Sequence, residues 1–206
     1  NAGHPGQSLD YSFELLNKYK NKWSKLEYII MMVTYPTLFY KMGESKESWR
    51  VKNYTIYYKI AISKDLRSHV EILNGQLIYH FQRLFKYYVK NIDEILCTEQ
   101  GWESTTTVET PGDTLIIDGI RAVKRHTVPY NRQCFVEMKS ALDSIIDFSR
   151  KNKCKIILCS PPVYKSYREN LNKNQLDSTI NTFVRIAKEN INCTYINLLD
   201  NARFKD

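Results

Sequence analysis

The stretch Lys155–Tyr164, KIILCSPPVY, decides the predicted fold. A short apolar run, Ile156–Cys159, follows Lys155 and stops at Ser160-Pro161-Pro162. A continuous apolar run of this kind is typical of a strand that is buried on both faces of a parallel sheet. Proline has no N–H to donate to a ladder of hydrogen bonds, so the strand must end at the prolines.

The residues after this strand predict a helix and then another strand. Asn172 or Asn174 can cap the helix, and its apolar positions recur at helical spacing: Leu176, Ile180, Phe183, Val184 and Ala187. A second short run, Cys193–Asn197, follows. Strand, helix and strand within about 45 residues is the size of a βαβ unit.

An earlier apolar run, Tyr28–Val33, predicts a second central strand that stops at Thr34-Tyr35-Pro36. Both central strands therefore end in a small hydroxyl residue that is followed within two positions by proline. In open parallel sheets, ligands bind just past the carboxyl ends of the strands. We therefore expect four residues at these strand ends to line one pocket: Thr34, Tyr35, Ser160 and Pro161.

Residues 1–7, NAGHPGQ, form a predicted loop that leads to a helix capped by Ser8. The loop delivers Gly6 and Gln7 to the amino end of that helix. Free backbone N–H groups and the positive end of the helix dipole meet there, which suits an anion or a developing oxyanion. The simpler alternative is a plain entry from loop to helix.

A long, largely helical insertion is expected between the central strands, at about residues 40–125 of a single domain that spans 1–206. Its strongest pattern is one amphipathic helix with apolar residues at Leu66, Val70, Leu73, Leu77, Phe81, Leu84 and Tyr88. The Thr-rich stretch Gly101–Thr110 predicts an exposed loop. His69 and His80 are interpreted as structural or exposed, because no carboxylate pattern near them indicates a metal.

His126 is expected in a loop before a helix that runs from about Tyr130 to Lys151. From that loop its side chain can reach the pocket, although a lone histidine is more often a bystander. The order of elements predicts an α/β three-layer sandwich with a mostly parallel, flavodoxin-like sheet.

Composition narrows the classes of partner. The formal net charge is +8, but the lysines are spread over several segments, which indicates solvated faces rather than a nucleic-acid interface. Attraction to anionic glycans or to a membrane surface is the alternative. Five cysteines without CxxC spacing predict neither a disulfide framework nor a zinc site. No cofactor is expected.

None of the self-contained catalytic motifs occurs: there is no phosphate loop, GxGxxG, HExxH or GxSxG. The arrangement nevertheless resembles the SGNH (GDSL-type) hydrolase superfamily, in particular a branch of bacterial cell-envelope proteins. The resemblance covers most of the chain and is carried by Gly6-Gln7, by Thr34-Tyr35-Pro36 with Leu38-Phe39, by Arg125-His126, by Ser160–Tyr164 with Tyr167-Arg168, and by Tyr195–Phe204.

The resemblance implies a serine nucleophile in a Gly-Asp-Ser-like block, which we expect upstream of Asn1. Gly6 matches a glycine whose N–H helps to form the oxyanion hole in that superfamily. Where the superfamily has an asparagine donor, this chain has Thr34-Tyr35-Pro36-Thr37, so that donor is absent. The Asp-x-x-His block is expected after Asp206. The chain is therefore interpreted as the central part of a longer enzyme, and no catalytic residue is assigned within it.

Two hypotheses follow. The first is an SGNH-like esterase or acyltransferase that acts on acylated carbohydrate or another ester, with Gly6 among its oxyanion donors. The second is a non-catalytic module that binds glycans or an envelope partner on the same scaffold. Both imply the bacterial cell envelope or periplasm, with the cytoplasm as the open alternative.

Overall fold

The computed structural model describes residues 3, 6–70, 77–92 and 112–201. The chain divides into two compact units, and each is described by itself. The first contains Asn1–Ser48 and Gly112–Asp206, and the second contains Trp49–Pro111. The second unit starts later than the insertion expected at 40–125, because the chain up to Ser48 belongs to the first unit. It also ends earlier, because the helix that ends at His126 belongs to the first unit as well.

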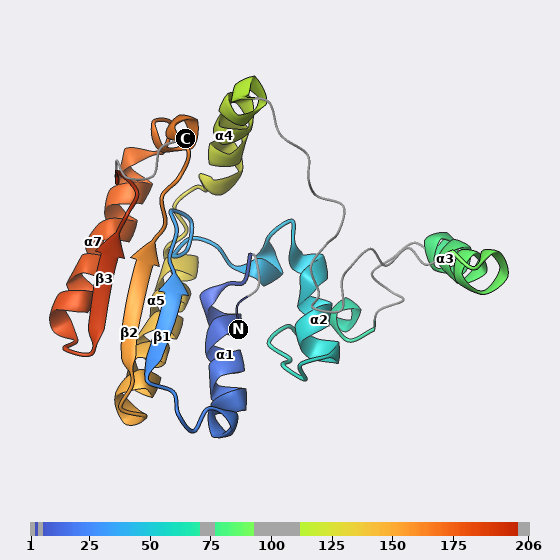
Figure 1. The fold of residues 1–206 in the computed structure, drawn as a ribbon, viewed down its shortest axis with the longest axis horizontal. Helices are drawn as coiled ribbons and strands as arrows, with labels where there is room; N and C mark the ends of the chain where they lie inside the picture. The colour runs from blue at the N-terminus through green and yellow to red at the C-terminus, as the bar shows by residue number, and fades with distance from the viewer. Residues whose placement is uncertain (1–2, 4–5, 71–76, 93–111, 202–206) are drawn as a thin grey trace. The chain divides into compact units, whose positions relative to one another are not determined.

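The first unit is built on a parallel sheet of three strands, β1 (Tyr28–Met32), β2 (Lys155–Ser160) and β3 (Cys193–Asn197), in the order β1-β2-β3 (Figure 1). Ile29 of β1 pairs with Ile156 of β2, which pairs with Cys193 of β3. The α/β class and the parallel sheet predicted from the sequence are confirmed. Since all three strands run the same way, their carboxyl ends lie at one edge.

The helices of the first unit form between the strands and before them. They are α1 (Leu9–Tyr19), α4 (Gly112–His126), α5 (Arg132–Lys151), α6 (Lys165–Arg168) and α7 (Lys173–Glu189), with 3-10 turns η1 (Lys20–Lys22) and η2 (Met42–Glu44). A further 3-10 turn, η3 (Ser48–Arg50), crosses the boundary between the units in the sequence. Asparagine caps two of them. Asn131 accepts a hydrogen bond from the Cys134 N–H at 3.1 Å, and Asn172 accepts one from the Gln175 N–H at 3.0 Å. Of the two asparagines considered for α7, Asn172 is therefore the cap.

The core lies on one face of this sheet. Apolar side chains of α1, α5 and α7 pack there against the inward residues of the strands, including Ile156 and Leu158, and Figure 1 shows α5 and α7 running alongside the strands. Successive right-handed crossovers between strands that lie in sequential order place their helices on the same face. That rule accounts for the position of α5 and α7.

Within the described residues of the first unit, no helix covers the opposite face of the sheet. Ile30 is 67% exposed, and Tyr28, Met32 and Ile196 are also exposed. The expectation that the strands are buried on both faces is wrong for this part of the chain. The apolar run could not reveal this, because the two faces of β1 carry equally apolar residues.

The second unit contains α2 (Val51–Ile56), a 3-10 turn η4 (Leu66–Ser68) and α3 (Leu77–Lys90). The single helix predicted from Leu66 onward is wrong in its first part, since Leu66–Ser68 forms only a turn and α3 begins at Leu77. Leu73 and the predicted loop Gly101–Thr110 lie outside the described residues. Within the described ranges, no helix is long and apolar enough to cross a membrane.

The two faces of the sheet should respond differently to truncation. Leu158 is 0% exposed, so Leu158→Ala should lower the free energy of unfolding by about 2–5 kcal/mol, the usual cost of a large-to-small core change. Ile30→Ala on the open face should change it by less than about 1 kcal/mol. Urea unfolding followed by circular dichroism measures both, and equal losses would contradict a one-sided core.

Candidate functional site

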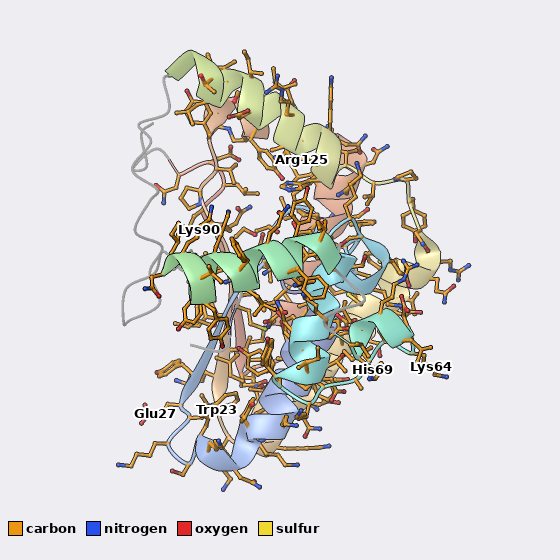
Figure 2. The ribbon with its side chains drawn as sticks, turned by 90° about the vertical axis from the view of Figure 1, so that its right-hand side faces the viewer. Trp23, Glu27, Lys64, His69, Lys90 and Arg125 are labelled. Atoms are coloured by element: carbon orange, nitrogen blue, oxygen red, sulfur yellow. The ribbon has the colours of Figure 1, made fainter. Side chains whose placement is uncertain are left out.

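A histidine and a tyrosine from distant segments meet beyond the carboxyl end of β2. His126 is the last residue of α4, not a loop residue as expected. Its Nδ1 lies 2.8 Å from the hydroxyl of Tyr167 in α6. The two rings meet edge to face, with centroids 5.6 Å apart. Figure 2 shows the neighbouring Arg125 at this end of α4.

Tyr35, which follows β1, joins this pair. Its side chain is buried, with 3% exposed, and its hydroxyl lies 2.9 Å from the Thr127 hydroxyl. Its ring packs edge to face on the Tyr167 ring at 6.5 Å. We call Tyr35, His126, Thr127 and Tyr167 the His–Tyr cluster. The sequence indicated Tyr35 and His126, and Tyr167 is the residue that connects them.

Buried polar side chains of α7 hold the backbone around the His–Tyr cluster. The Gln175 side chain donates to the His126 carbonyl at 3.1 Å and accepts from the Val128 N–H at 3.2 Å. The Thr179 hydroxyl donates to the Tyr35 carbonyl at 3.2 Å. A search for apolar periodicity missed both residues. They were detectable only as polar residues four apart, in line with Phe183, on the face that α7 buries.

Burial and nearby charges favour the neutral forms of His126 and Tyr167. Burial lowers the pKa of His126 below its usual 6.5, and the Arg125 guanidinium lowers it further, while Glu47 acts in the opposite direction. Burial, with a smaller effect of Tyr35, raises the pKa of the Tyr167 phenol. A neutral imidazole therefore meets a neutral phenol near pH 7.

The second ring nitrogen of His126 is available to a ligand. Across the residues that the structure describes, Nε2 has no hydrogen-bond partner. If the phenol donates to Nδ1, Nε2 carries the ring proton and donates; in the other tautomer Nδ1 donates to the phenol and Nε2 accepts. Both forms can bind a hydroxyl group, but only the form with the proton on Nε2 can donate to a carbonyl oxygen.

Gly119 allows α4 to approach α6. A Cβ atom at this position would lie 2.1 Å from the Ser166 hydroxyl oxygen and 2.9 Å from the backbone nitrogen of Tyr167. Both distances are shorter than any normal contact. The absence of a side chain at Gly119 therefore sets how closely Tyr167 can lie to α4, the helix that carries His126.

The loop before α1 has the conformation that its glycine permits. Gly6 has a φ of 67°, in the left-handed region that glycine adopts without strain. Ser8 occupies the cap position, but its hydroxyl donates to the Asp10 carboxylate at 2.5 Å and accepts from the Met42 N–H at 3.2 Å. Gln7 donates to the Ser12 hydroxyl at 2.9 Å. The contact with Met42 ties the start of α1 to the segment that follows β1.

The same carboxylate of Asp10 also accepts the Tyr11 N–H at 2.9 Å. The chain therefore supplies its own negative charge to the amino end of α1, where the helix dipole favours it. An oxyanion role for this region consequently depends on the loop N–H of Gly6 rather than on the Tyr11 N–H.

The remaining predicted site residues lie at the same sheet edge but make other contacts. Ser160 is only 4% exposed, and its hydroxyl lies 2.8 Å from that of Tyr195 on β3. Pro161 follows it and is half-buried. Thr34 is exposed, and its N–H donates to the Thr37 hydroxyl at 2.7 Å. In the described ranges, no hydrogen bond joins these residues to His126.

The Ser160 hydroxyl is thus engaged with a phenol rather than with a base, and the geometry does not make it a nucleophile. A shallow hollow of about 320 Å³ lies beside its partner, between α7 and β3, lined by Val184, Ala187, Lys188, Cys193, Thr194 and Tyr195. None of the predicted site residues lines it. Among the described residues, no group of three His, Cys, Asp or Glu side chains is arranged to hold a metal.

Comparisons with protein-family models, with curated proteins and with solved structures found no match to this chain.

Replacing Gly119 should disturb the His–Tyr cluster. Overpacking costs about 1–3 kcal/mol, and the better helix propensity of alanine returns up to about 1 kcal/mol. We expect Gly119→Ala to lower the free energy of unfolding by about 1–2 kcal/mol and to shift the His126 ring resonances in NMR spectra. Lys124→Ala, at an exposed position of the same helix, is the control and should change neither. A Gly119→Ala protein that is more stable than the wild type would refute the close approach.

Acid should destabilise the protein through His126. Its folded-state pKa lies below 6.5, so the unfolded state binds the proton first as pH falls. The contribution of this residue to stability is complete above pH 6.5 and decreases below it, until the lowered folded-state pKa is reached. Urea unfolding over a pH series measures this loss of stability, and an NMR titration of His126 measures its folded-state pKa.

Two variants isolate this effect. His126→Gln should remove this part of the pH dependence. Arg125→Gln should raise the folded-state pKa of His126 towards 6.5 and make the dependence shallower, because a nearby positive charge is lost. A folded-state pKa at or above 6.5 in the wild-type protein would show that the environment of His126 has been misassigned.

Proposed function

We propose that this chain contributes the substrate-binding edge of an SGNH-like esterase or O-acyltransferase that acts on acylated carbohydrate. The observation that carries the proposal is the His–Tyr cluster, which lies past the carboxyl ends of β1 and β2, where open parallel sheets bind ligands. A serine attacks the ester carbonyl in this mechanism, and Gly6 N–H is among the oxyanion donors. The proposal assigns no nucleophile or base within residues 1–206.

The chemistry of the cluster suits a neutral, hydroxyl-rich substrate. His126 Nε2 offers one donor or acceptor, and burial of the pair favours the uncharged forms of both rings. A neutral hydrogen-bonding group can contact a sugar hydroxyl or an ester carbonyl without the desolvation cost of a buried charge. The Tyr167 hydroxyl fixes the orientation of the imidazole, and Gln175 holds the backbone of His126. His126 is therefore a positioning group for the substrate.

A non-catalytic glycan-binding module is the second candidate. The observation that favours it lies in the second unit, where Trp49 and Tyr57 have exposed rings. Aromatic rings of this kind stack on the apolar faces of sugars. Glycan binding without ester turnover would support this function and exclude the first.

Ester turnover by the full-length protein tests the enzymatic proposal. p-Nitrophenyl acetate and an O-acetylated oligosaccharide are suitable ester substrates, and labelling with a fluorophosphonate reports an activated serine. We expect His126→Gln to raise KM for the oligosaccharide about tenfold, the equivalent of one hydrogen bond. The p-nitrophenyl acetate reaction should change less, because that substrate carries no sugar.

The matched control is His69→Gln, which replaces an exposed histidine of the second unit and should leave both reactions unchanged. Tyr167→Phe should resemble His126→Gln, because it removes the hydroxyl that orients the ring. If the full-length protein neither turns over esters nor reacts with the fluorophosphonate, the enzymatic proposal fails. If it does both and His126→Gln behaves as the wild type, only the role of His126 fails.

A further inference from the structure

Helix α3 presents an exposed apolar face. Eight of its apolar and aromatic side chains are each more than half exposed, and six of them share one face: Ile78, Phe81, Leu84, Phe85, Tyr88 and Val89. At 3.6 residues per turn they fall within an arc of about 140°. Tyr88 is the most exposed of them, at 74%. The helix thus carries a continuous apolar stripe rather than scattered apolar residues.

The other side of the same helix is basic. Arg83, Lys86 and Lys90 lie on it, and no Asp or Glu occurs between Leu77 and Lys90. Lys90 lies at the carboxyl end of α3 (Figure 2), with its ammonium group 5.9 Å from the centre of the Phe85 ring. The ammonium group therefore caps the edge of the apolar stripe, as lysine does when its stem lies along apolar surface.

We propose that α3 binds the surface of an anionic membrane, lying in the plane of the interface with its apolar stripe among the acyl chains. A large apolar stripe, a polar face with basic and no acidic residues, and aromatic residues at their border characterise interfacial helices. Tyr87 lies at that border, and its ring contacts the Tyr88 ring with centroids 5.0 Å apart. Tyrosine favours this depth, because its ring is apolar and its hydroxyl remains hydrated.

Charge complementarity selects an anionic lipid surface over other occupants. Helix α3 itself carries three basic residues, Arg83, Lys86 and Lys90, and no acidic residue, so its own formal charge is positive. A nucleic acid would use the basic face and leave the apolar stripe in water, whereas a bilayer uses both faces at once. The proposal is independent of ester turnover, since it concerns only the second unit.

Vesicle co-sedimentation of the whole chain tests the proposal, with phosphatidylcholine vesicles compared with mixed phosphatidylcholine–phosphatidylglycerol vesicles. The wild type should bind the mixed vesicles and bind phosphatidylcholine alone much more weakly. Each lysine or arginine near an anionic surface strengthens binding about fivefold. The triple variant Arg83→Gln, Lys86→Gln, Lys90→Gln should therefore bind the mixed vesicles up to about 100-fold more weakly.

The matched control removes the same charge elsewhere. The triple variant Lys151→Gln, Arg185→Gln, Lys188→Gln changes exposed residues of α5 and α7, and both triple variants lower the formal charge from +8 to +5. The control should retain most of the binding. Equal losses in the two variants would overturn a specific role for α3, as would a wild-type chain that does not bind the mixed vesicles.

The double variant Phe81→Ser, Leu84→Ser tests the apolar stripe. We expect at least a tenfold loss of binding to the mixed vesicles and little change in the thermal unfolding midpoint, because both side chains are exposed. A lower unfolding midpoint with unchanged vesicle binding would show that the stripe packs against protein, and the membrane proposal would fail.

Discussion

The parallel pairing of β1 with β2 is the constraint on which the candidate site depends. It joins residues 28–32 to residues 155–159 in register, and the Val33 N–H extends the ladder to the Cys159 carbonyl at 2.9 Å. Because the two strands end at the same level, Tyr35 and the segment that contains Tyr167 leave the sheet side by side. The contact between those two rings is a consequence of strand register.

Helix α7 then holds the backbone of Tyr35 and His126 in place at this edge of the sheet. α7 buries polar side chains where a purely structural helix would bury apolar ones, and these side chains hold the carbonyls of Tyr35 and His126. A buried polar group is costly unless its hydrogen bonds are satisfied. The network satisfies these carbonyls with hydrogen bonds and thereby holds the backbone around the histidine on the side that α7 supports.

The strands and the main helices could be predicted from the sequence because their patterns are local. The apolar runs before Pro36 and Pro161, and the helical spacing before Lys151, specify elements without reference to the rest of the chain. The face of the sheet that the first unit's helices leave uncovered could not be predicted, since Ile30 and Ile29 are equally apolar and only the crossovers decide which of them those helices cover. The start of the long helix expected from Leu66 was also predicted wrongly, because apolar periodicity does not mark where a helix begins.

For the same reason, only part of the candidate site could be predicted from the sequence. Tyr35 and His126 could be selected because they lie near predicted strand and helix ends. Tyr167 could not, because its role depends on a contact with His126, which lies 41 residues earlier in the sequence. Thr34 and Ser160 were expected beside them, yet each is engaged by a closer partner, Thr37 and Tyr195. The rule that sites lie past strand ends identifies the correct edge of the sheet. Which residues interact at that edge depends on which hydrogen-bond partners are nearest to each side chain.

Gly119 has a consequence for the divergence of related chains. Where α4 crosses α6, position 119 has room for a hydrogen atom only. A related chain that keeps this crossing should therefore keep glycine there, whereas the exposed positions of α4 can be substituted. A glycine seven residues before a histidine, with a tyrosine after a later proline pair, is therefore a pattern that should outlast the surrounding sequence. It offers a way to trace this architecture among chains too diverged for ordinary similarity.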